Sequence, residues 1–330
     1  MHIDFYGVPP IMRSVLKKKL KKHSLTFTKD CLTLKNVNSS TEILGIFVDS
    51  QIDKQILKKL KKLKLIVTLS TGYDHIDLVS TSQKKITVCN VPSYGEHTVA
   101  QHTLALMLAL SRKLFNAVKH VKEGGFDYHG LCGFDLKDKT IGIIGTGHIG
   151  IHVIHMLQGF DVHIIAYDKF PNKELAKKYN FSYVSLKKLF VTSDIISIHV
   201  PLFTQTIHLI NKSRIKQMKK GVYLINTARG ALIDAAALLF GLETGIIAGA
   251  GLDTFEDEEV LQTTESLLDT HLNKDIVKIT AINQKIIDHP NTLVTPHSAF
   301  NSNESLQRIA NTTVDNIEQY LLKTPINTLS

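Results

Sequence analysis

The stretch that decides the fold is Gly145-Thr146-Gly147-His148-Ile149-Gly150, a G-x-G-x-x-G pattern. It directly follows an apolar run, residues 140–144, and it opens a helical pattern that continues to Leu157. A second apolar run, residues 162–167, ends in Asp168, which lies 168 − 150 = 18 residues beyond the last glycine. Alone the pattern is weak, but strand, glycine turn, helix, strand and acidic residue in this order predict a dinucleotide-binding unit.

Each part of this stretch has a chemical purpose. Gly145, Gly147 and Gly150 permit a tight turn and close approach of the backbone, and the helix beginning at His148 and Ile149 offers free N–H groups to a pyrophosphate. Asp168 is expected to accept hydrogen bonds from the adenosine ribose, and its charge would repel a 2′-phosphate. We therefore expect NAD rather than NADP. Two reservations stay open: Lys169 could soften that preference, and Asp168 could simply be a carboxylate in a turn.

Working outward, short apolar runs alternate with helical patterns through most of the chain. Continuous apolar strands separated by helices are typical of parallel sheets that are covered on both faces. The fold class that we predict is therefore α/β, with doubly wound, Rossmann-like parallel sheets. The runs that suggest strands are residues 65–67, 140–144, 162–166, 195–198, 222–225, 247–250 and 293–294.

The helical segments suggest how the domains are arranged. Residues 96–122 read as one long helix that stops at Gly124-Gly125 and connects two domains. After Phe300, residues 301–304 are expected to cap a last helix that ends near Leu322 and packs back on the first domain. We therefore expect a discontinuous, flavodoxin-like substrate domain at 1–100 plus 301–330, a nucleotide-binding Rossmann domain at 101–300, and a cleft between them.

The bulk composition excludes several classes of protein. With 330 residues, 43% of them hydrophobic and 21% charged, the chain is long enough for two domains with ordinary cores. Its apolar stretches are interrupted by charge, so no membrane span is expected, and the first residues do not resemble a signal peptide. Cys31, Cys89 and Cys132 form no metal-ligand pattern. We expect a cytoplasmic protein without a metal cofactor.

The net charge of +9 raises the alternative of a nucleic-acid partner. Most of the excess lies in two lysine runs, residues 17–22 and 58–64. In the second run Leu57, Leu60 and Leu63 recur every three residues, which is typical of the buried stripe of an amphipathic helix. The lysines then form a solvated face. Because aromatic interleaving and recognised binding motifs are missing, we expect no nucleic-acid partner.

Three residues beyond the glycine loop suggest the chemistry. Arg229 stands in Asn-Thr-Ala-Arg-Gly and can grip a carboxylate through two parallel hydrogen bonds. His297 stands in Thr-Pro-His-Ser-Ala-Phe and can transfer a proton near neutral pH. A carboxylate beside that histidine would favour its charged form, but chemistry alone does not choose among the four acidic residues 256–259. Together these parts suggest hydride transfer to a small oxo acid.

With these motifs in order, the chain resembles the D-isomer-specific 2-hydroxyacid dehydrogenases over nearly its whole length. Several separate motifs carry the resemblance, and their shared order makes it specific. They are residues 70–77 (Ser-Thr-Gly-Tyr-Asp-His-Ile-Asp), 90–94 (Asn-Val-Pro-Ser-Tyr), 145–150, 199–202 (His-Val-Pro-Leu), 226–230, 251–256 (Gly-Leu-Asp-Thr-Phe-Glu) and 295–300.

The resemblance implies a role for each matching residue. Arg229 would hold the substrate carboxylate, His297 would act as acid and base, and Glu258, five residues beyond Asp253 (258 − 253 = 5), would be the partner of the histidine. Asp253 would lie near the nicotinamide carboxamide. Backbone N–H groups of Thr71 and Gly72 would help to hold the substrate, with Tyr94 and Phe300 in its pocket, although these two could be plain core aromatics. The cofactor groove would also include His148, Ile149, Val200, Pro201, Thr206, Thr227 and Ala228.

Within the family, the resemblance is nearest to the D-lactate dehydrogenases. The stretch from Glu258 to His297 is long, 297 − 258 = 39 residues, and D-lactate dehydrogenases resemble the chain in this insertion. We therefore expect reversible reduction of pyruvate to D-lactate by NADH, and, by resemblance, a homodimer joined through the nucleotide-binding domains. Two alternatives remain: a dehydrogenase of the 2-hydroxyisocaproate type for a larger oxo acid, and an NAD(H)-sensing protein similar to transcriptional co-repressors.

Overall fold

The structure is a computed structural model that describes residues 1–256, 258 and 274–329. The chain forms two compact units. The first comprises Met1–Gly95 and Asn301–Ser330, and the second is Glu96–Phe300. Each unit is described by itself below.

The first unit is built on a five-stranded parallel sheet in the order β2-β1-β3-β4-β5, which is the flavodoxin-type order. Its strands are β1 (His2–Tyr6), β2 (Ser24–Thr28), β3 (Ile43–Ile46), β4 (Leu65–Thr68) and β5 (Thr87–Cys89). Its helices are α1 (Pro10–Lys19), α2 (Lys54–Lys59), α3 (Leu78–Gln83) and α13 (Asn303–Leu321). As expected, α13 begins at a cap, the Ser302 hydroxyl, which accepts from the Ser305 N–H, and it packs on α1.

The lysine-rich segment after residue 57 differs from the expectation in one respect. Leu57, Leu60 and Leu63 are all buried, as their spacing suggests. However, α2 ends at Lys59, so Leu60 and Leu63 lie in the following turn rather than on the helix. A three-residue spacing also fits a short helix that leads into a tight turn, and this is why the pattern predicted the burial but overextended the helix.

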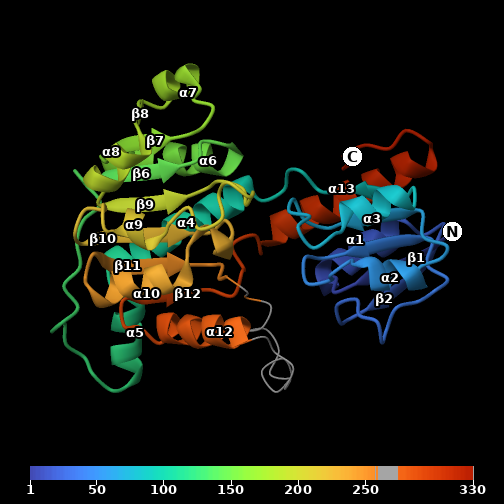
Figure 1. The fold of residues 1–330 in the computed structure, drawn as a ribbon, viewed down its shortest axis with the longest axis horizontal. Coiled ribbons are helices and arrows are strands. Elements are labelled where there is room, and N and C mark those ends of the chain that lie inside the picture. Colours follow the sequence, from blue (N-terminus) through green and yellow to red (C-terminus); the bar gives the residue numbers. More distant parts are fainter. Residues whose placement is uncertain (257, 259–273, 330) are drawn as a thin grey trace. The chain divides into compact units, whose positions relative to one another are not determined.

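The second unit is built on a seven-stranded parallel sheet in the order β12-β11-β10-β9-β6-β7-β8 (Figure 1). Counted along the chain within this unit, the order is 7-6-5-4-1-2-3, the Rossmann order extended by one strand. The strands are β6 (Thr140–Ile144), β7 (His163–Tyr167), β8 (Ser182–Tyr183), β9 (Ile195–Ile198), β10 (Val222–Asn226), β11 (Ile247–Leu252) and β12 (Thr292–Val294). The predicted α/β class with doubly wound parallel sheets is confirmed.

Helices cover both faces of this sheet. On one face, side chains of α4 and α6 form a core with Ile143 and Ile225, and on the other, side chains of α8, α9, α10 and α12 form a core with Ile144 and Leu224. Neighbouring strand residues thus face opposite cores, which explains the continuous apolar runs in the sequence. The helices are α4 (Glu96–Ser111), α5 (Leu114–Lys122), α6 (His148–Leu157), α7 (Lys173–Lys178), α8 (Leu186–Thr192), α9 (Lys212–Ile215), α10 (Ala235–Glu243), α12 (Lys274–Ile287) and the 3₁₀ turns η1 (Gln158–Phe160) and η2 (Gly230–Leu232).

The prediction of one long helix over residues 96–122 is wrong. Helix α4 ends at Ser111, and α5 starts at Leu114 after Lys113, whose φ of 47° is left-handed. The carbonyl of Ser111 accepts from the N–H of Phe134 at 2.8 Å, so a partner from outside the helix takes the acceptor at the end of α4. The end of α5 at Lys122, before Gly124 with its φ of 93°, is as expected.

A search of the helices in the described part of the chain finds none that is long and apolar enough to cross a bilayer.

Candidate functional site

The candidate site of the second unit lies at the carboxyl edge of its sheet. All seven strands are parallel, so the segments that follow them emerge at one edge. The glycine loop follows β6, Asp168 follows β7, and Val200 follows β9. The order in which strands are added reverses between β6 and β9: β7 and β8 lie on one side of β6, and β9 to β12 lie on the other. Parallel sheets typically bind ligands at such a switch point.

The glycine loop fits a dinucleotide. Gly145 has a φ of 96°, and a Cβ there would lie 2.6 Å from the carbonyl oxygen of His199, so only glycine lets β6 turn beside β9. Gly147, the N-cap of α6, has open space where its Cβ would be, which is the approach that a pyrophosphate needs. A Cβ on Gly150 would lie 2.0 Å from the carbonyl oxygen of Gly145. The loop therefore matches the requirements for holding NAD at the N-terminus of α6.

Asp168 is attached to this loop through its side chain. Its Oδ2 accepts from the Thr146 N–H at 2.7 Å and from the Thr146 hydroxyl at 3.0 Å, and its Oδ1 accepts from the Phe170 N–H. The ammonium of Lys169 lies over the Phe170 ring, 5.5 Å from its centroid. The carboxylate therefore both shapes the glycine loop and brings negative charge to the end of β7, where a ribose is expected.

The remaining residues expected in the cofactor groove line the same edge of the sheet. His148 and Ile149 begin α6, and Val200 packs against Gly145. The Thr206 hydroxyl donates to the Pro201 carbonyl at 2.8 Å and accepts from the Phe203 N–H at 2.7 Å, so it fixes the loop after β9. Thr227 and Ala228 belong to the turn after β10.

Arg229 is presented by a turn that a buried asparagine holds. Asn226, fully buried at the end of β10, accepts from the Ala228 N–H at 3.1 Å and donates to the Arg229 carbonyl at 2.9 Å. The next residue, Gly230, touches the chain after β11 so closely that a Cβ would lie 1.8 Å from the backbone of Phe255. This contact fixes the turn that carries Arg229 against the segment that leads to Glu258.

His297 follows β12 in a strained and strongly anchored loop. Its φ is 47°, an uncommon conformation for a residue other than glycine. Its N–H donates to the Asp253 carbonyl at 2.8 Å. The carboxylate of Asp253, only 1% exposed, accepts from the Thr295 hydroxyl at 2.5 Å and from the N–H groups of Ser298 and Ala299 at 2.9 Å each. Asp253 therefore shapes the histidine loop, and its contact with a nicotinamide stays a prediction.

The imidazole of His297 is paired with Glu258. The Nδ1 atom lies 2.5 Å from Glu258 Oε1, and Glu258 Oε2 accepts from the Phe255 N–H at 3.0 Å. Burial lowers the pKa of His297, but the hydrogen bond and the charge of Glu258 outweigh it, so the pKa lies above its ordinary value of 6.5. Arg229 lowers and Asp253 raises the same pKa by smaller amounts. The Nε2 atom is the other ring nitrogen, and it is the one that can exchange a proton with a substrate.

The structure separates two acidic residues that the sequence left equivalent. Glu258 pairs with His297, whereas Glu256 pairs with a different histidine: its Oε1 lies 2.5 Å from His208 Nε2. The other two members of the run, Asp257 and Glu259, lie outside the described residues. The same holds for residues 259–273 of the long insertion, whose later part forms α12.

Two other histidines of this unit have lowered pKa values and so favour the neutral form. Burial lowers the pKa of His199 to about 3, and its Nε2 lies 2.8 Å from the Ser197 hydroxyl. Burial and the neighbouring His97 lower the pKa of His152, whose ring lies 3.9 Å from that of His97 between centroids. His297 differs from both, because its partner is a carboxylate.

The predicted substrate residues divide between the units. Thr71 and Gly72 follow β4 and Tyr94 follows β5, at the carboxyl edge of the first sheet, while Phe300 ends the second unit. Asn90 donates to the Thr71 carbonyl at 2.9 Å, and Arg308 donates to the Tyr94 carbonyl at 2.6 Å. Among the described residues, no backbone acceptor bonds the N–H groups of Thr71 and Gly72, and their contact with a substrate stays a prediction.

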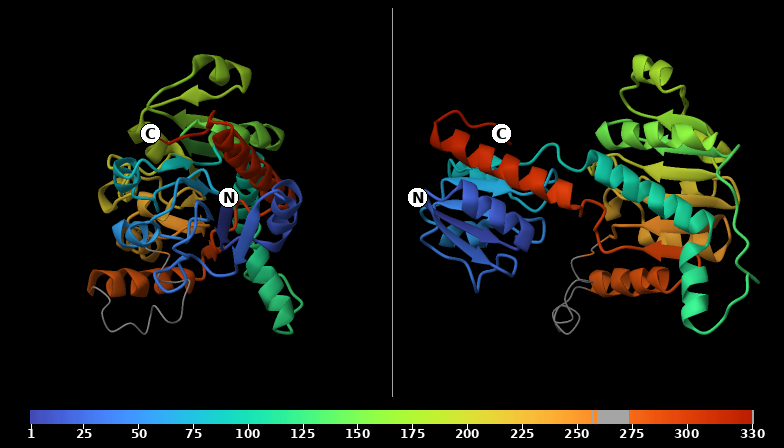
Figure 2. Two further views of the ribbon diagram at one scale, coloured as in Figure 1. Left: turned by 90° about the vertical axis from the view of Figure 1, so that its right-hand side faces the viewer. Right: turned by 180° about the vertical axis from the view of Figure 1, so that it is seen from behind.

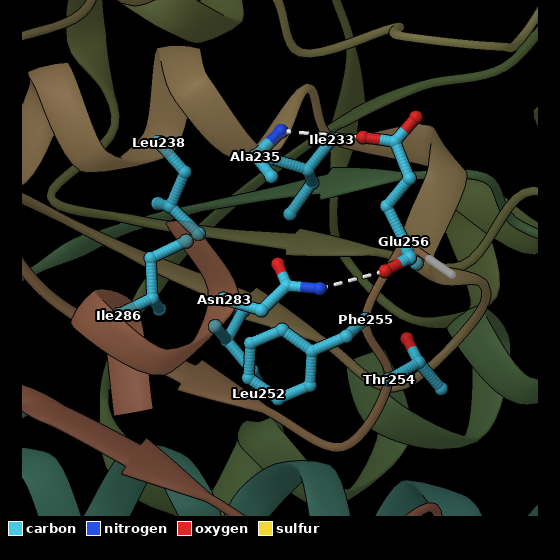
Figure 3. Close-up of a pocket in the computed structure, with 10 residues that line it drawn as sticks. Ile233, Ala235, Leu238, Leu252, Thr254, Phe255, Glu256, Asn283 and Ile286 are labelled. Carbon is cyan, nitrogen blue, oxygen red and sulfur yellow. Dashed lines mark hydrogen bonds between the residues drawn. The ribbon is translucent and has the colours of Figure 1, made fainter. Parts of the chain in front are cut away.

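A small cavity lies between the segments that follow β10 and β11 and the helices α10 and α12 (Figure 3). Its lining includes Gly230, Phe255 and Glu256, and the Asn283 amide closes it by donating to the Glu256 carbonyl at 2.7 Å. The Asn283 Oδ1 and Thr254 Oγ1 atoms are buried without a partner in the described structure. The cavity is mostly apolar and belongs to the packing that supports the Glu256 segment.

Comparison with known proteins agrees with this geometry. Residues 104–299 match the model of the "D-isomer specific 2-hydroxyacid dehydrogenase, NAD binding domain". The chain belongs to the D-isomer-specific 2-hydroxyacid dehydrogenase family. Among the relatives of this dehydrogenase, an aromatic 2-oxoacid reductase of Clostridium sporogenes is 37% identical over 85% of the chain and 83% of the relative. D-lactate dehydrogenase of Escherichia coli is 34% identical over 86% of the chain and 84% of the relative.

A solved structure has the same fold. D-lactate dehydrogenase from Aquifex aeolicus, in complex with NAD and lactic acid, aligns with a TM-score of 0.87 and 32% identity over 99% of this chain and 100% of that one. The dehydrogenase described here is therefore an NAD-dependent oxidoreductase by family, and the expectation of NAD as its cofactor is confirmed.

Several residues of the site escaped sequence reasoning. The sequence does point to Asn226, because this residue opens the Asn-Thr-Ala-Arg-Gly motif that contains Arg229. His102 and His208 had no such signal, because a chain with 16 histidines gives no reason to choose among them before their partners are known. Thr103 had none either, because its partner Thr227 is 124 residues away in the sequence. Their contacts depend on the tertiary fold.

Proposed function

We propose that this dehydrogenase reduces pyruvate to D-lactate with NADH, and oxidises D-lactate in reverse. The observation that carries the proposal is the His297–Glu258 pair, which follows β12 and β11 on the sheet edge where Arg229 follows the neighbouring β10. A histidine whose pKa is raised by a carboxylate, near an arginine that can bind a carboxylate, suits a 2-oxo acid.

The residues divide the reaction among them. Bound NADH supplies the hydride. Arg229 binds the substrate carboxylate and polarises the C2 carbonyl. By resemblance to the family, the N–H groups of Thr71 and Gly72 are assigned to the same carboxylate. The Nε2 atom of His297 donates a proton to the carbonyl oxygen, and Glu258 stabilises the imidazolium until that transfer. In the oxidation of D-lactate, the neutral imidazole accepts the proton again.

Two features of the chain favour pyruvate among the 2-oxo acids. Tyr94 and Phe300 are the aromatic residues that we propose to keep the pocket small, and the long segment between Glu258 and His297 is a feature shared by resemblance with D-lactate dehydrogenases. The aromatic 2-oxoacid reductase among the relatives makes a larger substrate the main competitor.

The test is a substrate panel. Purified protein is assayed for NADH oxidation with glyoxylate, pyruvate, 2-oxoisocaproate and phenylpyruvate, and kcat/KM is compared. Pyruvate should exceed the larger acids by at least about tenfold, since misplacing a methylene or ring in a fitted pocket costs about 1–3 kcal/mol. A preference for phenylpyruvate would refute D-lactate specificity but not the family chemistry. If no 2-oxo acid is reduced, the chain is an NAD(H)-binding protein rather than an enzyme.

We also propose that the protein is a homodimer joined through the second unit. Helix α5 contains no buried residue, and it extends away from the seven-stranded sheet (Figure 2). Leu114, Val118 and Val121 are 56%, 46% and 52% exposed and share one face of the helix. Phe126 and Tyr128, just beyond it, are 94% and 81% exposed. Exposed large apolar side chains that gather on one helix face of a folded protein are typical of an interface.

The oligomeric state tests this part of the proposal. Val118→Glu should shift the protein from dimer to monomer in light scattering coupled to size-exclusion chromatography. Asn116→Glu, an exposed position on the opposite face of α5, is the matched control and should leave the dimer intact. A wild-type monomer at micromolar concentration would refute the proposal.

A further inference from the structure

Helix α4 contacts both loops that carry the reacting side chains. Two consecutive residues, His102 and Thr103, make these contacts. His102 Nε2 lies 3.0 Å from the Thr295 hydroxyl, in the loop of His297. The Thr103 hydroxyl lies 2.9 Å from the Thr227 hydroxyl, in the turn of Arg229. Neighbouring positions on a helix point about 100° apart, which allows one turn of α4 to reach two loops.

The hydrogen-bond donors in the first contact can be assigned. Thr295 has one hydroxyl proton, and Asp253 Oδ1, a carboxylate oxygen at 2.5 Å, can only accept it. The Thr295 oxygen therefore accepts from His102, whose proton must lie on Nε2. His102 Nε2 is also 3.5 Å from Asp253 Oδ1. The chain of contacts then continues from Asp253 to the N–H groups of Ser298 and Ala299, on the far side of His297.

The contact between Thr103 and Thr227 is buried, and its donor and acceptor can also be assigned. Thr103 is fully buried, and its hydroxyl donates to the Val99 carbonyl within α4 at 2.8 Å. Its oxygen is left to accept, so Thr227 donates to it. Thr227 is two residues before Arg229 in the turn that Asn226 already ties at its other end. Since α4 packs against β10, β11 and β12, it spans the strands from which both loops emerge.

We propose that His102 and Thr103 are positioning residues that set the placement of His297 and Arg229 independently of each other. His102 holds the His297 loop through Thr295, and Thr103 holds the Arg229 turn through Thr227. This inference rests on the proposed function only for its kinetic consequences. Its structural content, two separate anchors on one helix, holds whatever the substrate is.

Two variants separate the anchors by their kinetics. His102→Leu removes the donor to Thr295, so His297 drifts from Glu258, and kcat should fall about tenfold while the KM for the 2-oxo acid changes less than about twofold. Thr103→Val removes the other anchor, so KM should rise about five- to tenfold with a smaller loss of kcat. Because the two anchors act on different loops, the double variant should combine the two effects additively on the free-energy scale.

Conservative variants and a matched control distinguish positioning from general stability. His102→Gln keeps a donor near the Nε2 position and Thr103→Ser keeps the hydroxyl, so both should restore most of the loss. Gln101→Ala changes the exposed neighbouring residue on the same helix and should leave kcat and KM unchanged. Thermal midpoints measured for the five single variants and the double variant show whether any loss merely follows unfolding.

A readout without turnover keeps this inference separate from the proposed function. In an NMR titration of labelled histidine, the pKa of His297 should fall toward its ordinary value in His102→Leu and stay unchanged in Thr103→Val. If the wild-type protein reduces no 2-oxo acid, the proposed function fails while this titration still tests the anchors. The inference would be overturned if both variants had equal effects on kcat, KM and the pKa of His297. It would also be overturned if the pKa of His297 in His102→Leu equalled that of the wild type.

Discussion

Replacing Glu258 by glutamine should test whether this carboxylate is what raises the pKa of His297. The carboxylate meets two donors: His297 at Oε1, 2.5 Å away, and the Phe255 N–H at Oε2, 3.0 Å away. A glutamine side chain has one oxygen and one NH₂ group, so it can accept from only one of them. If the oxygen stays with Phe255, the NH₂ faces His297 Nδ1 and requires that atom to be unprotonated. The imidazolium then loses its partner.

The size of the effect follows from the bond that is lost. A hydrogen bond to a charged group contributes about 1.5–3 kcal/mol, and each 1.4 kcal/mol corresponds to about a tenfold change in rate. Pyruvate reduction by Glu258→Gln should therefore slow by about ten- to 100-fold near neutral pH. Both side chains of the pair are about one-quarter exposed, so solvent screens the interaction only in part.

The pH dependence gives the sharper test. Reduction needs protonated His297, whose pKa is raised in the wild-type protein, so its rate should hold above the ordinary value of 6.5 and then fall. In Glu258→Gln the fall should begin at lower pH. Oxidation of D-lactate needs the neutral imidazole and should lose less. Steady-state kcat in both directions, from about pH 5 to about pH 9, checks this. If the pH profile of Glu258→Gln coincides with that of the wild type, Glu258 does not set the protonation of His297.

Four further outcomes are expected. Gly230→Ala places a Cβ 1.8 Å from the Phe255 backbone, so unfolding free energy in urea should fall by at least about 2 kcal/mol, and wild-type stability would contradict the close contact. Asp168→Asn keeps an acceptor for the Thr146 N–H but removes charge, so the kcat/KM ratio of NADPH to NADH should rise about tenfold, and an unchanged ratio would argue against a ribose contact. Arg229→Lys should raise the KM for pyruvate at least about tenfold, because lysine lacks the bidentate grip, and an equal KM would exclude that role. The pKa of His297 is raised in the folded protein, so protonated His297 stabilises the fold fully at pH values below the pKa of the unfolded state. This contribution to the free energy of unfolding is lost as the pH rises through the pKa of the folded state. Denaturation midpoints measured against pH should show this loss in the wild type and not in His297→Gln.

Most of the fold could be predicted from local patterns in the sequence. Strand β6 could be located to the residue, because an apolar run buried on both faces stops where a glycine turn begins. The prediction of one helix over residues 96–122 fails at residues 112–113 for a physical reason. Nothing local breaks the helical pattern there, and the interruption involves the Phe134 N–H, a partner more than twenty residues away that bonds the Ser111 carbonyl. A tertiary hydrogen bond of this kind leaves no mark on helical periodicity.

The site was predictable to the extent that each residue lies in a recognisable turn. Arg229 and His297 follow strands, and parallel strands bring their carboxyl ends to one edge. The supporting residues were not predictable in this way. Asn226 ends β10 and Asp253 follows β11, as many other polar residues do at strand ends. Only the folded loops show that Asn226 ties the Arg229 turn and that Asp253 accepts from Thr295, Ser298 and Ala299.

The assignment of Glu258 shows where chemistry, spacing and structure each contribute. On chemistry alone, any carboxylate of residues 256–259 could be the partner of His297. The spacing from Asp253 in the family that the chain resembles points to Glu258. The structure adds a reason why Glu256 is unavailable: its side chain already bonds His208, and the Asn283 amide holds its carbonyl from the other side. The segment thus makes two histidine–glutamate pairs two residues apart. In the pair with His208, the side chains are 40% and 15% exposed, and the pair ties the loop after β9 to the segment after β11. In the pair with His297, the net effect is a raised pKa. Glu256 is thus engaged by His208, and Glu258 is the carboxylate that pairs with His297.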